Sequence, residues 1–265
     1  MARYRLHHSL GRRTVVRHLH RWAKRHFSDR RRCRHQKLSD AMLLALLLTR
    51  LVFKHPYPSI WWSLLREGRH GLPSYTQAYT RGLRLLEQLE TIVTPANRCT
   101  EVIIDSMPLP VCRTRRGKRC AFPGATWGFG TQGKVFGYKL HALRRGAPSR
   151  WVSPTGRIVQ YLLRPANLHD ITVGYELNRR WPEFGAPKII GDKGYCSLGF
   201  TFPPKTNTRY DTGWRGDRHP KVRKRIETVF SQLVEAQIRS VQTKTLVSLR
   251  FRVVLAVIAH NLAQP

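Results

Sequence analysis

Three carboxylates of this chain stand at positions that favour metal-dependent chemistry. Asp105 and Asp192 each follow a short apolar run, and Glu227 follows a run of Lys and Arg in a segment of helical periodicity. Carboxylate oxygens from two strand ends and a helix can bind hard divalent ions, which activate a nucleophile and stabilise a leaving oxygen. An isolated acid is more often a surface charge or a helix cap. Together, however, these three predict a metal site for phosphodiester chemistry.

The composition points to a polyanionic partner. The 265 residues include 48 Lys and Arg against 15 Asp and Glu, which gives a formal net charge of +33. Basic side chains release condensed counterions from nucleic acid, so we expect a nucleic-acid partner, with an acidic membrane surface as the other candidate.

The sequence favours a cytoplasmic protein with no membrane segment. Its longest apolar run, Ala41–Leu48, is shorter than the roughly 18–20 residues that span a bilayer. Residues 1–36 are basic throughout and lack the apolar core of a signal peptide. The five Cys include no C-x-x-C pair, which argues against a zinc module or a disulfide framework.

The chain divides by pattern into a basic arm (1–36), a helical DNA-binding region (37–98) and a catalytic region (99–265). The arm could order on DNA. Alternatively, it is a helix with an Arg-rich solvated face, because apolar residues recur in it at helical spacing. These residues are Val15, Val16, Leu19 and Trp22.

Residues 37–98 have the pattern of a helical region. Ser39 is placed to cap a helix over Asp40–Phe53, and a short helix follows over Ile60–Glu67. Ser74 is placed to cap a second long helix over Tyr75–Glu90. Helix, turn and helix resemble a helix-turn-helix, although a plain helical bundle has the same pattern. The residues predicted to contact DNA from the second helix are Tyr75, Gln77, Thr80, Arg81 and Arg84.

From residue 99 the pattern changes to strands followed by helices. Strands are predicted over Thr100–Asp105, Val135–Leu143, Ile158–Leu163, Pro187–Asp192 and Phe200–Phe202. Helices are predicted over Asp170–Arg180, Lys221–Ile238 and Leu246–Leu262. This order predicts an α/β fold with a mixed sheet flanked by helices.

Five segments in this region resemble those of a known family in their order and composition. They are Ile103–Pro110, Gly137–His141, Pro165–Asp170, Gly191–Tyr195 and Arg225–Leu233. On these segments the chain is similar to the DDE transposases of bacterial insertion sequences. The resemblance implies an RNase H-like catalytic domain preceded by an all-helical, helix-turn-helix-like region.

The resemblance also implies a site and a substrate. Asp105, Asp192 and Glu227 would be the catalytic triad and the ligands of Mg²⁺ or Mn²⁺, with two ions in the site. The partners implied are double-stranded DNA, as terminal inverted repeats and as target, with a protein dimer assembled on it. Two alternatives remain open, namely a transposase that has lost catalysis and only binds DNA, and a structure-selective nuclease on the same fold.

Cations near the three acids are predicted to contact the DNA backbone. They are Lys193, Arg223, Lys224, Arg225, Arg113, Arg115 and Arg116. Arg223 and Lys224 lie one helical turn before Glu227, so pairing with that carboxylate is the alternative for both. Three further residues stay outside the predicted catalytic set: Asp170 as a helix cap, His169 beside it, and His141 as a buried, hydrogen-bonded strand residue.

The connection after Asp192 is short for this fold. Parallel neighbouring strands are normally joined by a dozen or more residues, usually a helix. Here only Lys193–Gly199 separates Asp192 from the next predicted strand. We therefore expect either a rearranged edge strand or a site whose three acids are not assembled.

Overall fold

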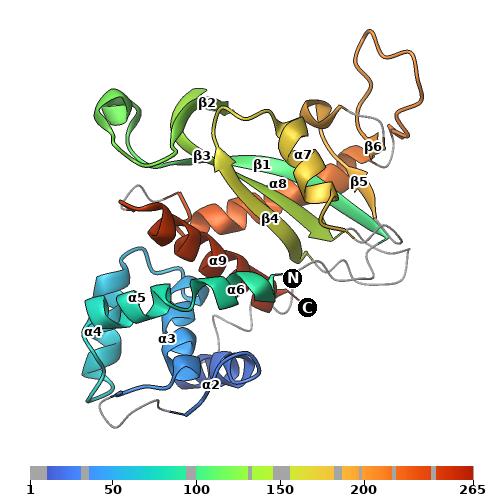
Figure 1. Cartoon of the computed structure of the whole chain (residues 1–265). Coiled ribbons are helices and arrows are strands. Elements are labelled where there is room, and N and C mark those ends of the chain that lie inside the picture. Colours follow the sequence, from blue (N-terminus) through green and yellow to red (C-terminus); the bar gives the residue numbers. More distant parts are fainter. Residues whose placement is uncertain are drawn as a thin grey trace.

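The computed structural model describes residues 11–30, 36–93, 100–130, 133–145, 156–181, 187–196, 199–216, 219–239 and 243–264. A helical region and an α/β region lie side by side (Figure 1). The helical region contains α2 (Arg12–Ala23), α3 (Asp40–Val52), α4 (Pro58–Glu67), α5 (Tyr75–Leu83) and α6 (Leu86–Ile92). The predicted caps are confirmed, because the Ser39 hydroxyl accepts from the Met42 N–H and Ser74 forms a reciprocal capping box with Gln77.

The predicted helix Tyr75–Glu90 is wrong as a single element. The structure breaks it after Leu83, and a separate helix, α6, starts at Leu86. Gly82 lowers the helix propensity at this point. Leu85, Leu86 and Leu89, at and after the break, are all buried, so these side chains stay in the core although the helix is interrupted.

Residues 12–23 of the predicted arm form a packed helix. The apolar face of α2 lies against α3, with Val15, Leu19 and Trp22 buried there. Burial of this face accounts for the helical spacing of the apolar residues in the sequence. Residues 1–10 and 31–35 of the predicted arm lie outside the described residues.

The α/β region is built on a six-stranded mixed sheet. Its strands are β1 (Glu101–Pro110), β2 (Thr126–Gly130), β3 (Gly133–Arg145), β4 (Ile158–Pro165), β5 (Lys188–Ile190) and β6 (Phe200–Thr201). β3 pairs antiparallel with β1, β2 and β4, whereas β5 and β6 run parallel to β1. This mixed sheet with flanking helices confirms the predicted RNase H-like fold class.

Strand β2 is absent from the sequence-based expectation. It contains two glycines in five residues, and glycine is depleted in strands. The structure gives the reason for Gly128, because a Cβ there would lie 2.1 Å from the Ala166 carbonyl oxygen. A close backbone approach, rather than strand propensity, therefore determines the residue at this position.

The sheet lies between two helical layers. Even-numbered residues at the start of β1, Val102 and Ile104, pack with α7 (Asp170–Asn178), and odd-numbered residues such as Ile103 face the opposite layer. That opposite layer contains α8 (His219–Glu235) and α9 (Leu246–Ala263). The alternation of side chains along a strand produces this division.

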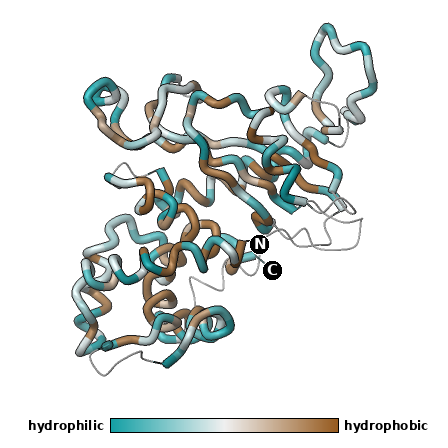
Figure 2. Tube along the Cα trace, viewed as in Figure 1, coloured by the Kyte–Doolittle hydropathy of each residue, from teal (hydrophilic) through white to brown (hydrophobic). Residues whose placement is uncertain are grey.

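Helix α9 joins the two regions. It contacts α3, α5 and α6 on one side and β4 and α8 on the other, so one hydrophobic core runs through both regions. Figure 2 shows hydrophobic residues gathered along these inner helices. By length and composition α9 is the one helix among the described residues that could cross a membrane, which the sequence analysis did not anticipate. In the structure its apolar residues, from Leu249 to Ala259, are mostly buried in this core.

The connection from β5 to β6 is short but keeps the strands parallel. Ile189 pairs with Phe200 and Ile190 with Thr201, so the expected alternative of a rearranged edge strand is wrong. The 3₁₀ turn η2 (Lys193–Tyr195) begins the connection, and residues 197–198 lie outside the described residues. The Gly191 N–H donates to the Thr201 carbonyl at 2.9 Å, which holds the two strand ends together.

Candidate active site

The sheet register brings Asp105 and Asp192 together. Ile103 of β1 pairs with Ile190 of β5 in the parallel ladder. Asp105 and Asp192 each come two residues later in the chain, so they occupy equivalent positions on adjacent parallel segments. Because side chains alternate with a period of two, both carboxylates leave the sheet on the same face. The two apolar runs read in the sequence are the strands that produce this alignment.

Asp105 is largely buried and electrostatically strained. Burial, together with the negative charges of Asp192 and Asp170, raises the pKa of Asp105 to about 7. The Ser106 N–H, which donates to Asp105 Oδ1 at 2.7 Å, and the charge of Arg223 oppose this rise. A carboxylate crowded by other carboxylates is stabilised by any cation that binds among them.

Asp192 begins the turn that follows β5. Its Oδ1 accepts a hydrogen bond from the Gly194 N–H at 2.8 Å, and it occupies the N-cap position of η2. The tight turn therefore fixes the direction of this carboxylate. Lys193, the next residue, is exposed to solvent.

Asp170 is a third carboxylate at this place, and sequence reasoning left it out of the site. A Cβ on Gly194 would lie 3.0 Å from Asp192 Oδ1 and 3.3 Å from Asp170 Oδ2, so the two carboxylates face the same point. Lys139 Nζ donates to Asp170 Oδ1 at 3.0 Å. Asp170 stands in the first helical turn of α7, while His169 occupies the N-cap position without a side-chain cap bond. The expectation that Asp170 caps the helix is thus wrong.

Two buried aromatic side chains, His141 and Tyr195, lie close to the acidic cluster of Asp105, Asp170 and Asp192. Tyr195 is fully buried, and its hydroxyl lies 3.2 Å from His141 Nδ1. Burial lowers the pKa of His141 to about 4, so this imidazole is neutral at neutral pH. The prediction of a buried, hydrogen-bonded His141 is confirmed. His141 and Tyr195 position the turn that bears Asp192, rather than facing solvent.

Glu227 lies on α8, which packs against β1, but its carboxylate is directed to a cation. Arg223 Nη2 lies 3.3 Å from Glu227 Oε1, one helical turn away, and the Glu227 side chain is 52% exposed. Arg223 also acts on Asp105, since its charge opposes the rise in the pKa of that group. Arg223 therefore interacts electrostatically with both Glu227 and Asp105. The alternative that Arg223 pairs with Glu227 is the arrangement observed.

The donor set fits a divalent cation only in part. Asp105 and Asp192 offer the hard oxygen atoms that Mg²⁺ and Mn²⁺ prefer, and the raised pKa of Asp105 marks an excess of negative charge. Within the described residues, however, no three His, Cys, Asp or Glu side chains gather closely enough to hold a metal ion. Glu227, the third predicted ligand, is paired with Arg223 instead.

The other predicted cations lie on α8 and on the segment that follows β1. Lys224 and Arg225 are exposed on α8, next to Arg223. Arg113, Arg115 and Arg116 are exposed where β1 continues into the 3₁₀ helix η1 (Thr114–Arg119). β1 runs on for five residues beyond Asp105, or roughly 17 Å, so this loop lies beyond the cluster along the strand.

The residues predicted to read DNA from α5 have mixed placements. Gln77 completes the capping box with Ser74, and Arg81 Nε donates to the buried Asp40 at 3.0 Å. Tyr75 is partly buried, and this burial raises the pKa of Tyr75 to about 12. Thr80 and Arg84 are exposed. Gln77 and Arg81 therefore have intramolecular roles that the sequence pattern did not reveal.

Comparison with known proteins supports one family. Residues 99–203 match the family model of the transposase DDE domain. The match begins just before β1 and ends just after β6, so it includes Asp105, Asp170 and Asp192 but not Glu227. Searches of curated proteins and of solved structures gave no match. The matched segment, which covers less than half of the chain, supports a DDE transposase.

Proposed function

We propose that this protein is a DNA transposase of a bacterial insertion sequence that cleaves and joins DNA strands at the ends of its element. The observation that carries the proposal is the alignment of Asp105 and Asp192 by the β1–β5 register, inside a segment that matches the transposase DDE domain. Transposition needs double-stranded DNA as substrate, both as terminal inverted repeats and as target. The net charge of +33 favours such a partner.

The proposed chemistry is phosphodiester hydrolysis followed by strand transfer. Mg²⁺ or Mn²⁺ bound at the carboxylates, as one or two ions, would supply Lewis acidity for the attacking and leaving oxygens. Asp105 and Asp192 would bind and orient these ions, because strand β1 and the η2 turn fix the directions of their carboxylates. We assign Glu227 as the third ligand, which requires its carboxylate to leave Arg223. Arg223 is then released to contact a DNA phosphate, so one movement would complete the ligand set and a phosphate contact.

Substitution of the central carboxylate tests this function. Asp105→Asn keeps the size of the side chain and removes the charge that binds the cation. We expect metal-dependent nicking of a labelled duplex carrying the element's own end to fall by at least about a hundredfold, while affinity for the same DNA is kept. The measurement is gel-resolved cleavage with Mg²⁺ or Mn²⁺ beside binding in EDTA.

A matched variant separates the site from a general loss of negative charge. Asp211 is 72% exposed and pairs with Arg215 rather than with the cluster. Asp211→Asn should therefore cleave as the unmodified protein does. Cleavage that persists in Asp105→Asn would contradict the assignment of the site.

The second candidate function is DNA binding without catalysis. It is favoured by one observation, the exposed Glu227 paired with Arg223 instead of gathered with the aspartates. Specific binding of the element's end with no cleavage in either metal would establish this alternative. Analytical ultracentrifugation with and without that DNA tests the accompanying proposal of a dimer on DNA.

A further inference from the structure

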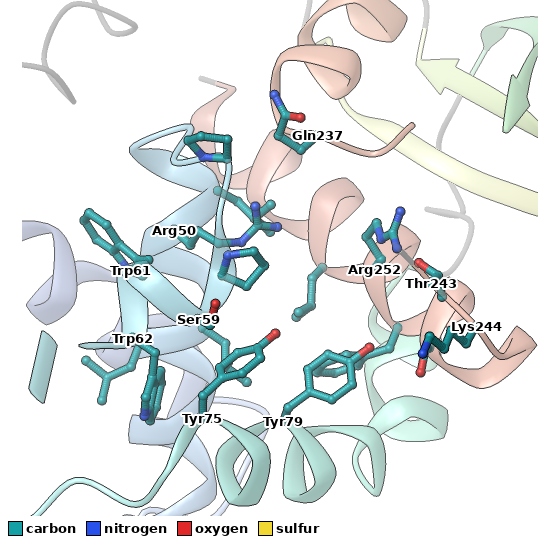
Figure 3. A pocket seen from close by; sticks show the side chains of 18 residues that line it. Arg50, Ser59, Trp61, Trp62, Tyr75, Tyr79, Gln237, Thr243, Lys244 and Arg252 are labelled. Carbon is teal, nitrogen blue, oxygen red and sulfur yellow. The ribbon is translucent and has the colours of Figure 1, made fainter. Parts of the chain in front are cut away.

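A cavity of about 410 Å³ lies between the helical region and α9, away from the acidic cluster. It is formed by the C-terminal half of α3, by α4 and α5, and by α9 with the segment before it (Figure 3). Its size is in the range of pockets that hold small organic ligands. Neither the proposed chemistry nor the packing of the core requires an opening here.

The polar side of the cavity is cationic. Arg50, Lys244 and Arg252 line it, and no Asp or Glu is present among the described residues of its wall. Arg50 Nη1 donates to a neutral group, the His55 carbonyl oxygen, at 3.0 Å. Burial lowers the pKa of Arg50 and lowers that of Arg252 to about 10, and the charge of Arg50 adds to the effect at Arg252. Cations desolvated next to one another favour an anion between them.

The opposite side of the cavity offers flat aromatic surface. Tyr75 and Tyr79 rise from α5 with ring centroids 5.7 Å apart, and Figure 3 shows both phenol rings reaching toward the space below Arg50 and Arg252. Both tyrosines line the cavity and are partly exposed in it. Aromatic faces next to arginine are the surfaces on which nucleobases stack.

An unpartnered hydroxyl also lines the cavity. Thr243 is only 7% exposed, and its Oγ1 has no hydrogen-bond partner among the described residues. A buried hydroxyl without a partner costs free energy, so a ligand that supplies one stabilises the folded state. Thr243 therefore points independently to an occupant with hydrogen-bonding groups.

We propose that this cavity binds one unpaired nucleotide of a DNA strand, with its phosphate between Arg50, Lys244 and Arg252 and its base on the Tyr75 and Tyr79 rings. The inference rests on the proposed function for its choice of DNA as the ligand. A paired base within a duplex cannot enter a pocket of this size, so the nucleotide has to be single-stranded or extruded from the helix. The site is separate from the carboxylates that carry out strand cleavage.

The test measures binding in EDTA, where no cleavage occurs. A fluorescent single-stranded oligothymidylate and a fully paired duplex of the same length are titrated with the protein, and anisotropy is recorded. Arg50→Met removes one charge, and Lys244→Gln removes another from an exposed position. We expect each variant to weaken oligothymidylate binding by about tenfold and duplex binding by much less.

Matched variants and a competitor make the outcome decisive. Arg66 is exposed on α4 outside the cavity, and Arg66→Met should weaken both DNAs slightly and equally. Tyr79→Ala should weaken oligothymidylate binding by about tenfold, because it removes a stacking ring. Thymidine 5′-monophosphate should compete only weakly. It can make the contacts inside the cavity, but it makes none of the contacts that the rest of a strand adds outside it.

Three results would overturn the inference. The first is equal weakening of oligothymidylate and duplex in the cavity variants, and the second is weakening by Arg66→Met as large as that by Lys244→Gln. The third is competition by the free mononucleotide as strong as that by the strand. Binding in EDTA is independent of catalysis, so loss of the proposed cleavage activity in the nicking assay would leave this result standing, and the reverse also holds.

Discussion

At the scale of single residues, the central question is how the protein tolerates Asp105. Burial disfavours the charged form of this carboxyl, and Asp192 and Asp170 add repulsion. The protein keeps this unfavourable free energy of the charged carboxylate at the position where a cation would bind. This combination is typical of a functional site, in which local stability is lost so that a ligand is bound more strongly.

A pH-dependent stability difference follows from the raised pKa of Asp105, which is about 7 in the folded protein and about 3.9 in an unfolded chain. Protonated Asp105 contributes fully to the free energy of unfolding below the pKa of the unfolded chain. This contribution is lost as the pH rises through the folded-state pKa of about 7. Asp105→Asn cannot ionise. In EDTA its melting temperature should therefore exceed that of the unmodified protein at pH 8, and the difference should shrink toward pH 4.

The size of this effect is on the order of 2–4 kcal/mol, since each unit of pKa corresponds to roughly 1.4 kcal/mol. Calorimetry or fluorescence melting across the pH range measures it. Equal melting temperatures at pH 8 would show that Asp105 ionises freely in the folded protein. Asp211→Asn, at an exposed position, provides the pH-independent reference.

Much of the site could be read from residue types, but not all of it. The apolar runs before Asp105 and Asp192 determined strands β1 and β5, and both residues come two positions after the paired residues Ile103 and Ile190. The Arg223–Glu227 pair followed from helical spacing. Asp170 could not be placed, because its approach to Asp192 depends on how α7 packs against the η2 turn. Tertiary contacts of this kind leave no local pattern.

At the scale of elements, the β5–β6 connection is the feature that departs most from expectation. A 3₁₀ turn starts the path where a longer crossover is usual, and the strands nevertheless remain parallel. Tyr195 makes this possible, because its buried ring fills the space beneath α7 and contacts the place of Gly174. One aromatic side chain thus holds the turn against the sheet.

Substitution of Tyr195 tests this role. Tyr195→Phe leaves the ring in place but removes the hydroxyl next to His141, and we expect the free energy of unfolding to fall by about 1–3 kcal/mol. Tyr195→Ala also removes the ring and should cost roughly 3–5 kcal/mol. Urea denaturation measures both. Tyr210→Phe, at a tyrosine 47% exposed, should change little, and a Tyr195→Phe effect no larger than this control would contradict the role.

Sequence patterns located most elements but missed two features of them. Strand β2 contains glycines that local propensity assigns to loops, and it is formed by antiparallel pairing with β3. The break between α5 and α6 is also invisible locally, because the buried leucines fit a continuous helix equally well. In both cases the packing of neighbouring elements outweighs the local preference.

At the scale of the whole molecule, the helical region and the sheet share one core through α9. The helices approach one another closely at Gly82 of α5, where a Cβ would lie 2.7 Å from Phe251 Cζ and 3.1 Å from Leu47 Cδ1. The absence of a side chain at this residue allows α3, α5 and α9 to meet. We therefore expect the two regions to unfold in a single cooperative transition.

The variant Gly82→Ala tests this coupling. Alanine favours a helix by about 1 kcal/mol over glycine. Here, however, the added methyl group overlaps a buried ring, and we expect a net loss of about 1–2 kcal/mol from overpacking. Thermal melting followed by far-UV circular dichroism should show one transition at a lower temperature. Gly216→Ala, where a Cβ would meet nothing within 4 Å, is the control that should not destabilise.

The shared core has a consequence for the order in which the protein is made. The ribosome delivers α3 and its apolar face long before it delivers α9, which follows every other described helix and strand in the chain. Until α9 is made, the side chains of the helical region that pack against it are exposed, and chaperones or other chains can bind to its leucines. A product that terminates before Leu246 would keep the strands that bear Asp105 and Asp192 but would be a target for proteolysis. Quality control would thus remove incomplete copies before they reach DNA.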